Sequence, residues 1–317
     1  MKVQKKIAKE YSLYAKNKFH LEGGILVKDY VIRATAGDGQ VRAFVATTTN
    51  MVEESRKLHN TTKVATAAFG RTLTATSMMG LMMKNDGDKL TVIIKGGGPI
   101  GTILATSNAK GIVKGYVENP NVEVPDYENG KLNVAAAVGT SGVVRVTKDL
   151  GLREPYNGAY PLVSGEIAQD LTHYFALSEQ TPSVVALGVL TTGMKVEHAG
   201  GFIVQLMPDA TEETISKLEE NVAKLTSITN MMSDGKTPQD ILNIVLEGLN
   251  PRILDKIDVG FECECSKERV QKVLVAIGKK ELASIIEEEK EAEIGCQFCN
   301  SKYKYSEEEL LAILKDM

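Results

Sequence analysis

The chain has 317 residues, of which 43% are hydrophobic, and its 37 Lys and Arg residues against 41 Asp and Glu residues leave a formal net charge of -4. These values are ordinary for a globular protein and exclude a disordered, collagen-like or nucleic-acid-coating chain. No window holds 18 consecutive apolar residues, so we expect neither a transmembrane helix nor a membrane partner. The length favours one large domain plus a small one.

Residues 1–26 form a basic segment with weak periodicity, which we predict to be an N-terminal extension that ends just after Gly23 and Gly24. The segment lacks the apolar core of a secretory signal and the Arg/Ser-rich pattern of a transit peptide, which favours a cytoplasmic, reducing location. It is either a mobile or docking extension, or translation begins at Val27 and the segment is not native. In both cases it takes no part in the functional argument.

Residues 27–230 have the pattern of a large sheet domain. Short runs rich in Val, Ile and Thr recur between Gly, Asn and Pro residues, and these runs are Lys28–Ala34, Val41–Thr47, Leu90–Ile94, Gly111–Val117, Val143–Thr147, Val184–Leu190 and Phe202–Leu206. Many connections are too short for crossover helices, and residues 128–131 are typical of a hairpin turn. We therefore predict an α+β domain with a mostly antiparallel sheet and packed helices.

Three segments of this domain have helical patterns. The first, Thr61–Met83, is long and nearly uncharged, which predicts a buried helix. The second, Glu166–Phe175, places its apolar residues in one stripe. The third, Thr211–Ile228, begins with a cap and two glutamates and has one apolar face, so we expect it to close the large domain.

Residues 231–260 are predicted to be a helical linker. Thr237 is a plausible cap with Pro238 at the first helical position, and Pro251 marks the stop. The apolar face of this helix is expected to comprise Ile241, Ile244, Val245 and Leu249. Such a face must lie against one of the two domains, and its cover is lost if the small domain changes.

The run Gly96–Gly101 satisfies G-x-G-x-x-G but does not predict a nucleotide site. Pro99 lacks an amide donor, and Ile103–Lys110 is too short and too polar for the helix that would hold a pyrophosphate. We expect a tight turn between two strands instead. No catalytic motif is present and the four histidines are isolated in the sequence, which argues against an enzyme; they are His20, His59, His173 and His198.

All four cysteines lie in the last fifth of the chain, as a CxC pair (Cys263 and Cys265) and a CxxC pair (Cys296 and Cys299). In a reducing compartment such pairs favour metal binding or redox chemistry over a disulfide framework. Four thiolates suit tetrahedral zinc, so we predict one Zn²⁺ per chain in a domain at residues 261–317. An iron–sulfur cluster and a thioredoxin-like dithiol are the alternatives, but no βαβ pattern surrounds the CxxC pair.

The segments around the cysteines predict a small scaffold: helices at Ser266–Ile277 and Glu281–Glu289, a hairpin around the CxxC pair, and a last helix capped by Ser306. A structural zinc contributes an apparent ~10 to 16 kcal/mol to such folds. Oxidation most easily joins near neighbours within each pair, and those loops restrict the unfolded chain by only about 1.6 and 1.9 kcal/mol. Oxidation should therefore unfold this domain, although a permanent structural zinc site is the alternative.

Several segments, together with the cysteine pairs, give a resemblance over about residues 27–317. They are Gly97–Gly101, Gly115–Pro120, Lys148–Gly151, Glu154–Tyr156 and Tyr174–Pro182. The chain resembles the bacterial redox-regulated heat-shock chaperone family, the thirty-three-kilodalton chaperonins, whose signature is a C-terminal CxC pair followed about thirty residues later by CxxC. The N-terminal segment is the one departure from that pattern.

The resemblance implies a cytoplasmic holdase that is inactive while reduced and zinc-bound. It implies that peroxide with heat, or hypochlorous acid, forms the disulfides Cys263–Cys265 and Cys296–Cys299, releases zinc, unfolds the linker and frequently produces a homodimer. Unfolding client proteins then bind without ATP. Two rivals remain: a zinc-ribbon nucleic-acid binder, which the 12 acidic against 9 basic residues from Cys263 onward disfavour, and a metabolic enzyme with a structural zinc, which no nucleophile or phosphate loop supports.

Overall fold

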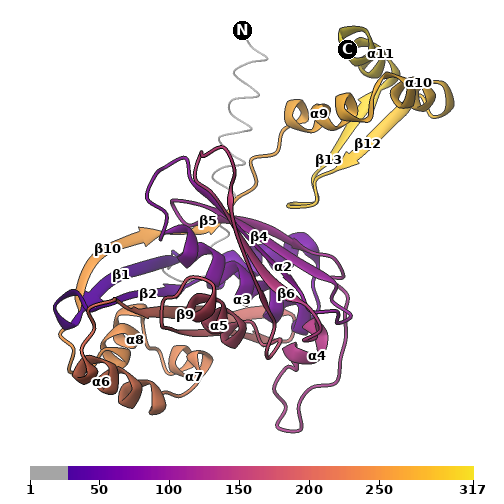
Figure 1. Cartoon of the computed structure of the whole chain (residues 1–317). Coiled ribbons are helices and arrows are strands. Elements are labelled where there is room, and N and C mark those ends of the chain that lie inside the picture. Colours follow the sequence, from indigo (N-terminus) through magenta and orange to yellow (C-terminus); the bar gives the residue numbers. More distant parts are fainter. Residues whose placement is uncertain (1–27) are drawn as a thin grey trace, which may run out of the picture.

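The computed structural model describes residues 28–317, so the predicted extension at residues 1–26 and His20 lie outside the described residues. The described chain is an α+β protein in which two mostly antiparallel sheets pack with helices and a small C-terminal module projects from them (Figure 1). The strands are β1 (Tyr30–Ala36), β2 (Val41–Thr47), β3 (Lys89–Lys95), β4 (Thr102–Asn108), β5 (Ile112–Val117), β6 (Val143–Asp149), β7 (Tyr156–Pro161), β8 (Ser183–Thr192), β9 (Lys195–Leu206), β10 (Arg252–Asp258), β11 (Gly260–Phe261), β12 (Glu291–Gly295) and β13 (Lys302–Ser306). The helices are α2 (Thr49–His59), α3 (Lys63–Gly80), α4 (Val134–Val138), α5 (Ala168–Leu177), α6 (Glu212–Ala223), α7 (Ile228–Ser233), α8 (Pro238–Val245), α9 (Lys267–Ile277), α10 (Lys279–Glu288) and α11 (Glu307–Asp316).

The predicted sheet is in fact two sheets. One has the strand order β10-β1-β2-β9-β8 and the other has the order β11-β5-β4-β3-β6-β7. All pairs in them are antiparallel except β11 with β5. Every run that was predicted as a strand is a strand, and β4 follows the predicted strand-to-strand turn, whereas β7, β10, β11 and helices α2 and α4 were not anticipated.

Helix α3 explains why there are two sheets. It is the predicted buried helix, though shorter than Thr61–Met83, and it lies between the sheets with both of them packed on it. Its threonine hydroxyls donate to carbonyls of the preceding turn, for example Thr72 to Ala68 at 2.9 Å and Thr76 to Thr72 at 2.7 Å. These bonds satisfy polar groups that have no access to water, so a Thr-rich helix can be buried on all sides.

The Gly96–Gly101 run is a strand-to-strand turn, as predicted. The Gly98 amide donates to the Val138 carbonyl at 2.9 Å and the Ile100 amide donates to the Ala137 carbonyl at 3.0 Å. A Cβ atom on Gly98 would lie 2.4 Å from the Ala137 oxygen. The glycines are therefore needed for close approach to α4, and these two amides are not free to hold a phosphate.

Residues 128–131 form a turn, but the expected hairpin is wrong. The Gly130 amide donates to the Tyr127 carbonyl at 2.8 Å inside the loop that joins β5 to α4, and no strand begins or ends at this turn. The Asn-Gly dipeptide thus predicted the turn correctly, but the two flanking strands of a hairpin are absent, because such a turn also forms within a long loop.

Helices α6, α7 and α8 cover the outer face of the five-stranded sheet (Figure 1). The helix predicted over Thr211–Ile228 ends at Ala223, and the separate helix α7 spans the predicted boundary between core and linker at residues 230–231. Helix α8 begins as predicted, with Pro238 at its first position and a reciprocal capping box between Thr237 and Asp240.

The apolar face of α8 differs from the prediction at one position. Ile241 is 1% exposed and Val245 is fully buried, but Ile244 is 37% exposed. Leu242 takes its place, because positions 241, 242, 245, 246 and 249 follow the helical repeat on one side. This face packs against the sheet, in a cluster that includes Ile32, Val45, Phe202 and Val204.

The second half of the predicted helical linker is a strand. β10 is an edge strand that pairs only with β1 among the described strands, and two residues later β11 pairs with β5 of the other sheet. Ile253 and Leu254 of β10 are exposed, so backbone hydrogen bonds rather than burial hold this strand. The sequence pattern missed β10 because an exposed edge strand has no apolar alternation to detect.

A charged residue at the buried face of α8 should release the helix from the sheet. We expect Ile241→Glu to destabilise this docking by about 2 to 4 kcal/mol, because it removes a buried side chain and places a carboxylate in apolar surroundings. Ile244→Glu is the matched control on the same helix and should change stability by at most ~0.5 kcal/mol. Limited proteolysis of residues 231–260 measures the difference, and equal protection in the two variants would show that α8 is not held by this face.

Candidate metal centre

The structure brings the four predicted cysteines together. Their sulfur atoms all lie within 4.8 Å of one another, and all four residues are partly buried. Two contacts cross between the pairs: Cys263 Sγ lies 3.7 Å from Cys296 Sγ, and Cys265 Sγ lies 3.2 Å from Cys299 Sγ. Two segments more than thirty residues apart in sequence thus meet at one point.

Each pair is positioned by regular structure on both sides. The CxC pair lies between β11 and α9, whose N-cap Ser266 accepts a hydrogen bond from the Arg269 amide. The CxxC pair lies in the loop of the β12–β13 hairpin, where the Cys296 amide donates to the Ser301 carbonyl at 2.9 Å and the Asn300 amide donates to the Cys296 carbonyl at 2.7 Å. Asn300 has a φ of 56°, a left-handed conformation that Asn tolerates well. The predicted hairpin and helices of this module are all present.

The donor set fits a tetrahedral metal ion of the zinc type. Four thiolates at about 2.3 Å from a central ion have sulfur–sulfur distances of about 3.8 Å. The Cys263–Cys296 contact of 3.7 Å matches this value, the Cys265–Cys299 contact of 3.2 Å is shorter, and all four sulfurs lie within 4.8 Å of one another. Burial raises the pKa of the Cys263 and Cys265 thiols. For Cys299 burial acts in the same direction, but hydrogen bonds from Ser301 and from other cysteines lower its pKa to about 7. A divalent cation supplies the positive charge that would keep all four sulfurs ionised.

Two hydroxyl groups contact the cysteine sulfurs, and neither was predicted from the sequence. The Tyr303 hydroxyl donates to Cys265 Sγ at 3.0 Å, and Ser301 Oγ lies 3.2 Å from Cys299 Sγ. The hydrogen bond to Cys265 is the largest cause that raises the pKa of Tyr303. Both hydroxyls follow the CxxC pair closely in sequence, and that proximity is the one signal that could have found them.

The rest of the module has a small apolar core. Its buried residues come from all three helices and from β13, and they are Val270, Leu274, Leu282, Ile286, Tyr305, Leu310 and Ile313. So few buried side chains give a domain of this size little stability of its own. The cysteine cluster lies between the CxC segment and the β12–β13 hairpin, so a cross-link at this point adds stability that the small core lacks.

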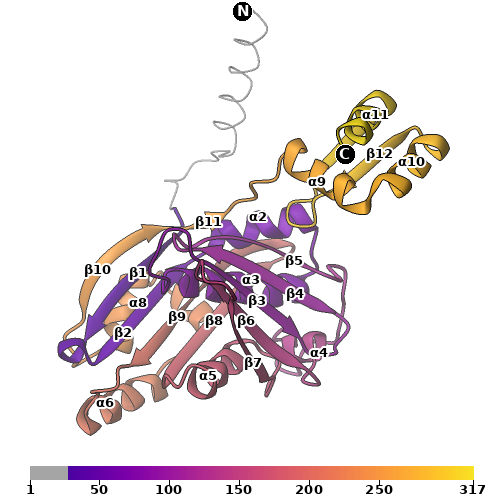
Figure 2. The ribbon, with the colours of Figure 1, turned by 45° about the horizontal axis from the view of Figure 1, so that its top comes forward.

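The CxxC loop also contacts the large domain at the end of α2 (Figure 2). His59 Nε2 lies 3.0 Å from the Phe298 carbonyl, and the Asn300 side-chain amide donates to the Leu58 carbonyl at 2.6 Å. Burial lowers the pKa of His59, so its ring is neutral at pH 7 and donates to this oxygen. His59 is isolated in the sequence, and the structure gives it a backbone partner 239 residues away. Tyr116 packs edge-on against the Phe298 ring, with centroids 5.8 Å apart.

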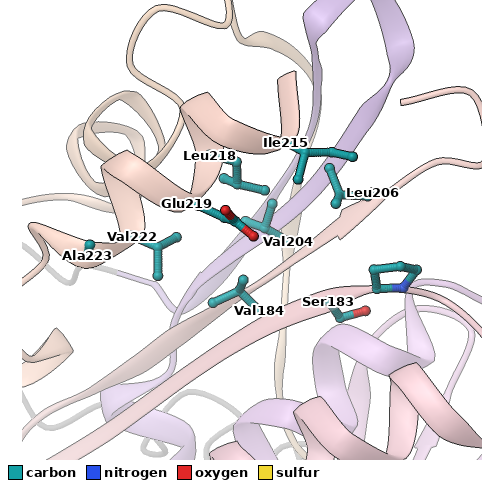
Figure 3. A pocket seen from close by; sticks show the side chains of 10 residues that line it. Ser183, Val184, Val204, Leu206, Ile215, Leu218, Glu219, Val222 and Ala223 are labelled. Carbon is teal, nitrogen blue, oxygen red and sulfur yellow. The ribbon is translucent and has the colours of Figure 1, made fainter. Parts of the chain in front are cut away.

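A separate cavity of about 360 Å³ lies between α6 and the strands β8 and β9 (Figure 3). Its lining is apolar apart from the Glu219 carboxylate and the Ser183 hydroxyl. One carboxylate in such surroundings makes neither a metal-ligand set nor an acid–base pair.

In residues 28–317 no helix is both long and apolar enough to cross a membrane.

Comparisons with known proteins agree with this architecture. A family model described as Hsp33 protein matches residues 29–306. A 33 kDa chaperonin from Clostridioides difficile (strain 630) is 79% identical over 291 residues, which cover 92% of this chain and 100% of that protein. One from Bacillus cereus (strain AH187) is 48% identical over 292 residues, with 92% and 100% covered. The crystal structure of a 33 kDa chaperonin from Thermotoga maritima superposes with a TM-score of 0.86 at 36% identity and covers 92% of this chain and 99% of that one.

The family match and the relatives thus identify a chaperone, and its C-terminal module carries a cluster of four cysteines. The chain belongs to the Hsp33 family.

Removing one ligand should cost the site its metal. We expect Cys296→Ser to lower bound zinc from one per chain to a small fraction, because the hydroxyl is a poor ligand for zinc and the remaining three sulfurs lose their closing partner. Elemental analysis of the purified reduced protein measures this. Full zinc occupancy in Cys296→Ser would contradict the assignment of the four cysteines as ligands.

Proposed function

We propose that this chaperone is a redox-regulated holdase that binds unfolding proteins without ATP after oxidative stress, in the cytoplasm. In the reduced state Cys263, Cys265, Cys296 and Cys299 hold one Zn²⁺ and the chaperone is inactive. Formation of the Cys263–Cys265 and Cys296–Cys299 disulfides releases the metal and switches the protein on. It acts by binding and not by catalysing a reaction, so we propose that it is not an enzyme.

The observation that carries this proposal is the apolar face beneath α8. The sheet residues Ile32, Ala43 and Phe202 are buried under the connector helices, and the same helix face is buried in return. An apolar surface of this kind, once uncovered, binds other apolar chains. Residues 231–260 therefore cover the apolar sheet face to which we propose that client proteins bind.

The cover is joined to the cysteine cluster by a short stretch of chain. After β10, Val259 and Phe261 are both buried in the core of the large domain, and Phe261 is 3% exposed. The Glu262 amide donates to the Val113 carbonyl at 2.8 Å, and Cys263 follows at once. A change in backbone position at the CxC pair is therefore transmitted directly to β11 and β10.

When bound, zinc holds the CxC and CxxC segments together as thiolates and stabilises the module. Each disulfide removes two electrons from a cysteine pair and passes them to a peroxide, which is reduced to water. The two disulfides close loops of only three and four residues, so they do not link the CxC segment to the hairpin. The small core of the module cannot replace that link, and the module unfolds.

Unfolding of the module removes the anchor at the C-terminal end of β11 and the contact of the CxxC loop with α2. Only their own packing then holds β10 and α8 in place. Moderate heat weakens this packing, because the conformational entropy gained on unfolding contributes more to the free energy at higher temperature. Client proteins bind the uncovered sheet, and two oxidised chains associate as a homodimer through the same kind of surface. The Gly98 and Ile100 amides of the Gly96–Gly101 turn already donate to carbonyls of α4, which supports a chaperone cycle that needs no nucleotide.

Oxidation should convert the protein from inactive to active in a single sample. We expect reduced, zinc-loaded protein to leave the thermal aggregation of a model enzyme unchanged. Peroxide at elevated temperature should release zinc and suppress that aggregation at near-stoichiometric amounts. Light scattering and a chromogenic zinc chelator follow both events together. If the reduced, zinc-loaded protein protects the client as well as the oxidised one, redox control is wrong.

The α8 variants test whether client binding is controlled by the docking of α8 on the sheet or by the metal site alone. Ile241→Glu should give partial client protection in the reduced state with its zinc still bound, because it loosens the cover directly. Ile244→Glu should behave like the unmodified protein. Inactivity of reduced Ile241→Glu, combined with a protease-sensitive α8, would show that the surface beneath α8 is not the client site.

A further inference from the structure

The four sulfur atoms of the candidate metal centre have different surroundings. Cys265 Sγ accepts a hydrogen bond from the Tyr303 hydroxyl at 3.0 Å, and Cys299 Sγ lies within hydrogen-bond distance of Ser301 Oγ, at 3.2 Å. As metal-bound thiolates the cysteines would have no proton, so the hydroxyl would then be the donor in both contacts.

The other two sulfurs have no such partner. Cys263 Sγ and Cys296 Sγ contact each other at 3.7 Å, and within residues 28–317 no hydroxyl group forms a hydrogen bond to either of them. Each cysteine pair therefore contains one sulfur with a hydroxyl donor and one sulfur without it. The asymmetry is larger in the CxxC pair, where Cys299 also accepts a backbone hydrogen bond from Ser301, than in the CxC pair, where Cys263 accepts one from Cys265.

A hydroxyl donor changes what a thiolate can do. The bond draws negative charge from the sulfur lone pairs and occupies one direction of approach. Among sulfurs that are all held as thiolates, the one with the hydroxyl bond is therefore the weaker nucleophile. Oxidation by a peroxide begins with nucleophilic attack by sulfur on the peroxide oxygen. The sulfur without the hydroxyl bond is thus the better attacking group in each pair.

We propose that Tyr303 and Ser301 select the sulfur at which oxidation begins: Cys263 in the CxC pair and Cys296 in the CxxC pair attack the oxidant, while Cys265 and Cys299 are the resolving thiolates. This inference rests on the proposed function in that it assigns the order of events within the same redox switch.

The chemistry is balanced within each pair. Hydrogen peroxide transfers one oxygen atom to Cys296 Sγ, which becomes a sulfenic acid, and the other oxygen leaves as hydroxide. The Cys299 thiolate attacks the same sulfur, the S–S bond forms, and the sulfenic hydroxyl leaves as a second hydroxide. The two electrons lost by the sulfur pair are the two gained by the peroxide.

The hydroxyls also connect the two oxidations. Tyr303 lies on β13, directly after the loop that carries the CxxC pair, so its bond to Cys265 joins the hairpin to the CxC segment. When the CxxC pair is oxidised and the hairpin moves, Cys265 loses this donor. The second pair then becomes more reactive than it was while the module was intact.

The test traps the first sulfenic acid. Reduced protein with its zinc content verified is given a short peroxide pulse in the presence of a dimedone-type reagent, and labelled peptides are quantified by mass spectrometry. In the unmodified protein we expect Cys296 to be labelled about three- to tenfold more than Cys299, since nucleophilicity responds to part of the hydrogen-bond energy. Equal labelling, or more label on Cys299, overturns the proposal without the need for any variant.

Three variants sharpen the test. Ser301→Ala should bring the labelling of Cys299 up to that of Cys296, and Tyr303→Phe should raise the labelling of Cys265 by a similar factor. Tyr305→Phe is the matched control, because it removes a hydroxyl from the same strand that donates to the Lys267 carbonyl at 2.7 Å and not to a sulfur. A labelling change in Tyr305→Phe equal to that in Tyr303→Phe would assign the effect to general loosening and contradict the proposal.

No client protein enters this measurement, so its failure is distinct from failure of the proposed function. If Cys296 is labelled first and oxidised protein still does not protect clients, only the chaperone switch is wrong. If clients are protected and Cys299 is labelled first, only the present inference is wrong.

Discussion

The tie between the CxC segment and the β12–β13 hairpin is the constraint on which the rest of the structure depends. The C-terminal module buries few side chains, and the four cysteine sulfurs, within 4.8 Å of one another, are where its two halves meet. A metal ion at this point joins segments more than thirty residues apart, which no disulfide within a pair can do. The stability of the module and the chemical state of its cysteines are therefore one equilibrium.

The linker at residues 231–260 lies between the C-terminal module and both sheets of the large domain, so a change in the module is transmitted to those sheets. Its helix α8 lies on the outer face of one sheet, its strand β10 extends the edge of that sheet, and β11 extends the edge of the other. Strand β10 is held mainly by backbone hydrogen bonds and exposes apolar residues such as Leu254, whereas β11 also buries Phe261 in the core. A segment held in this way is stable while both of its ends are fixed and is easily lost when one is released. The contact of His59 with the Phe298 carbonyl adds a second attachment between the module and the large domain.

The sequence predicted the features that depend on local chemistry. The cysteine pairs, the cap of α8 at Thr237 and Pro238, and the buried helix α3 all follow from spacing or composition, and the structure has them in the expected places. The features that were missed depend on distant partners. β10 and β11 are strands because β1 and β5 pair with them, and His59 is a contact residue because a loop 239 residues away reaches it. Ile244 was misplaced because one turn of helix offered two apolar candidates, Leu242 and Ile244, and only the sheet decides which is buried.

Hydrogen exchange of the connector during oxidation tests the central claim most directly. Reduced, zinc-loaded protein is treated with peroxide while zinc release is recorded, and amide protection of peptides from α8 and β10 is read by mass spectrometry. We predict that protection in both elements falls as zinc leaves, whereas the peptides of α3 remain protected because that helix is buried between the two sheets. Complete zinc release and formation of both disulfides, with α8 and β10 as protected as in the reduced protein, would contradict the coupling between the cysteine cluster and the connector.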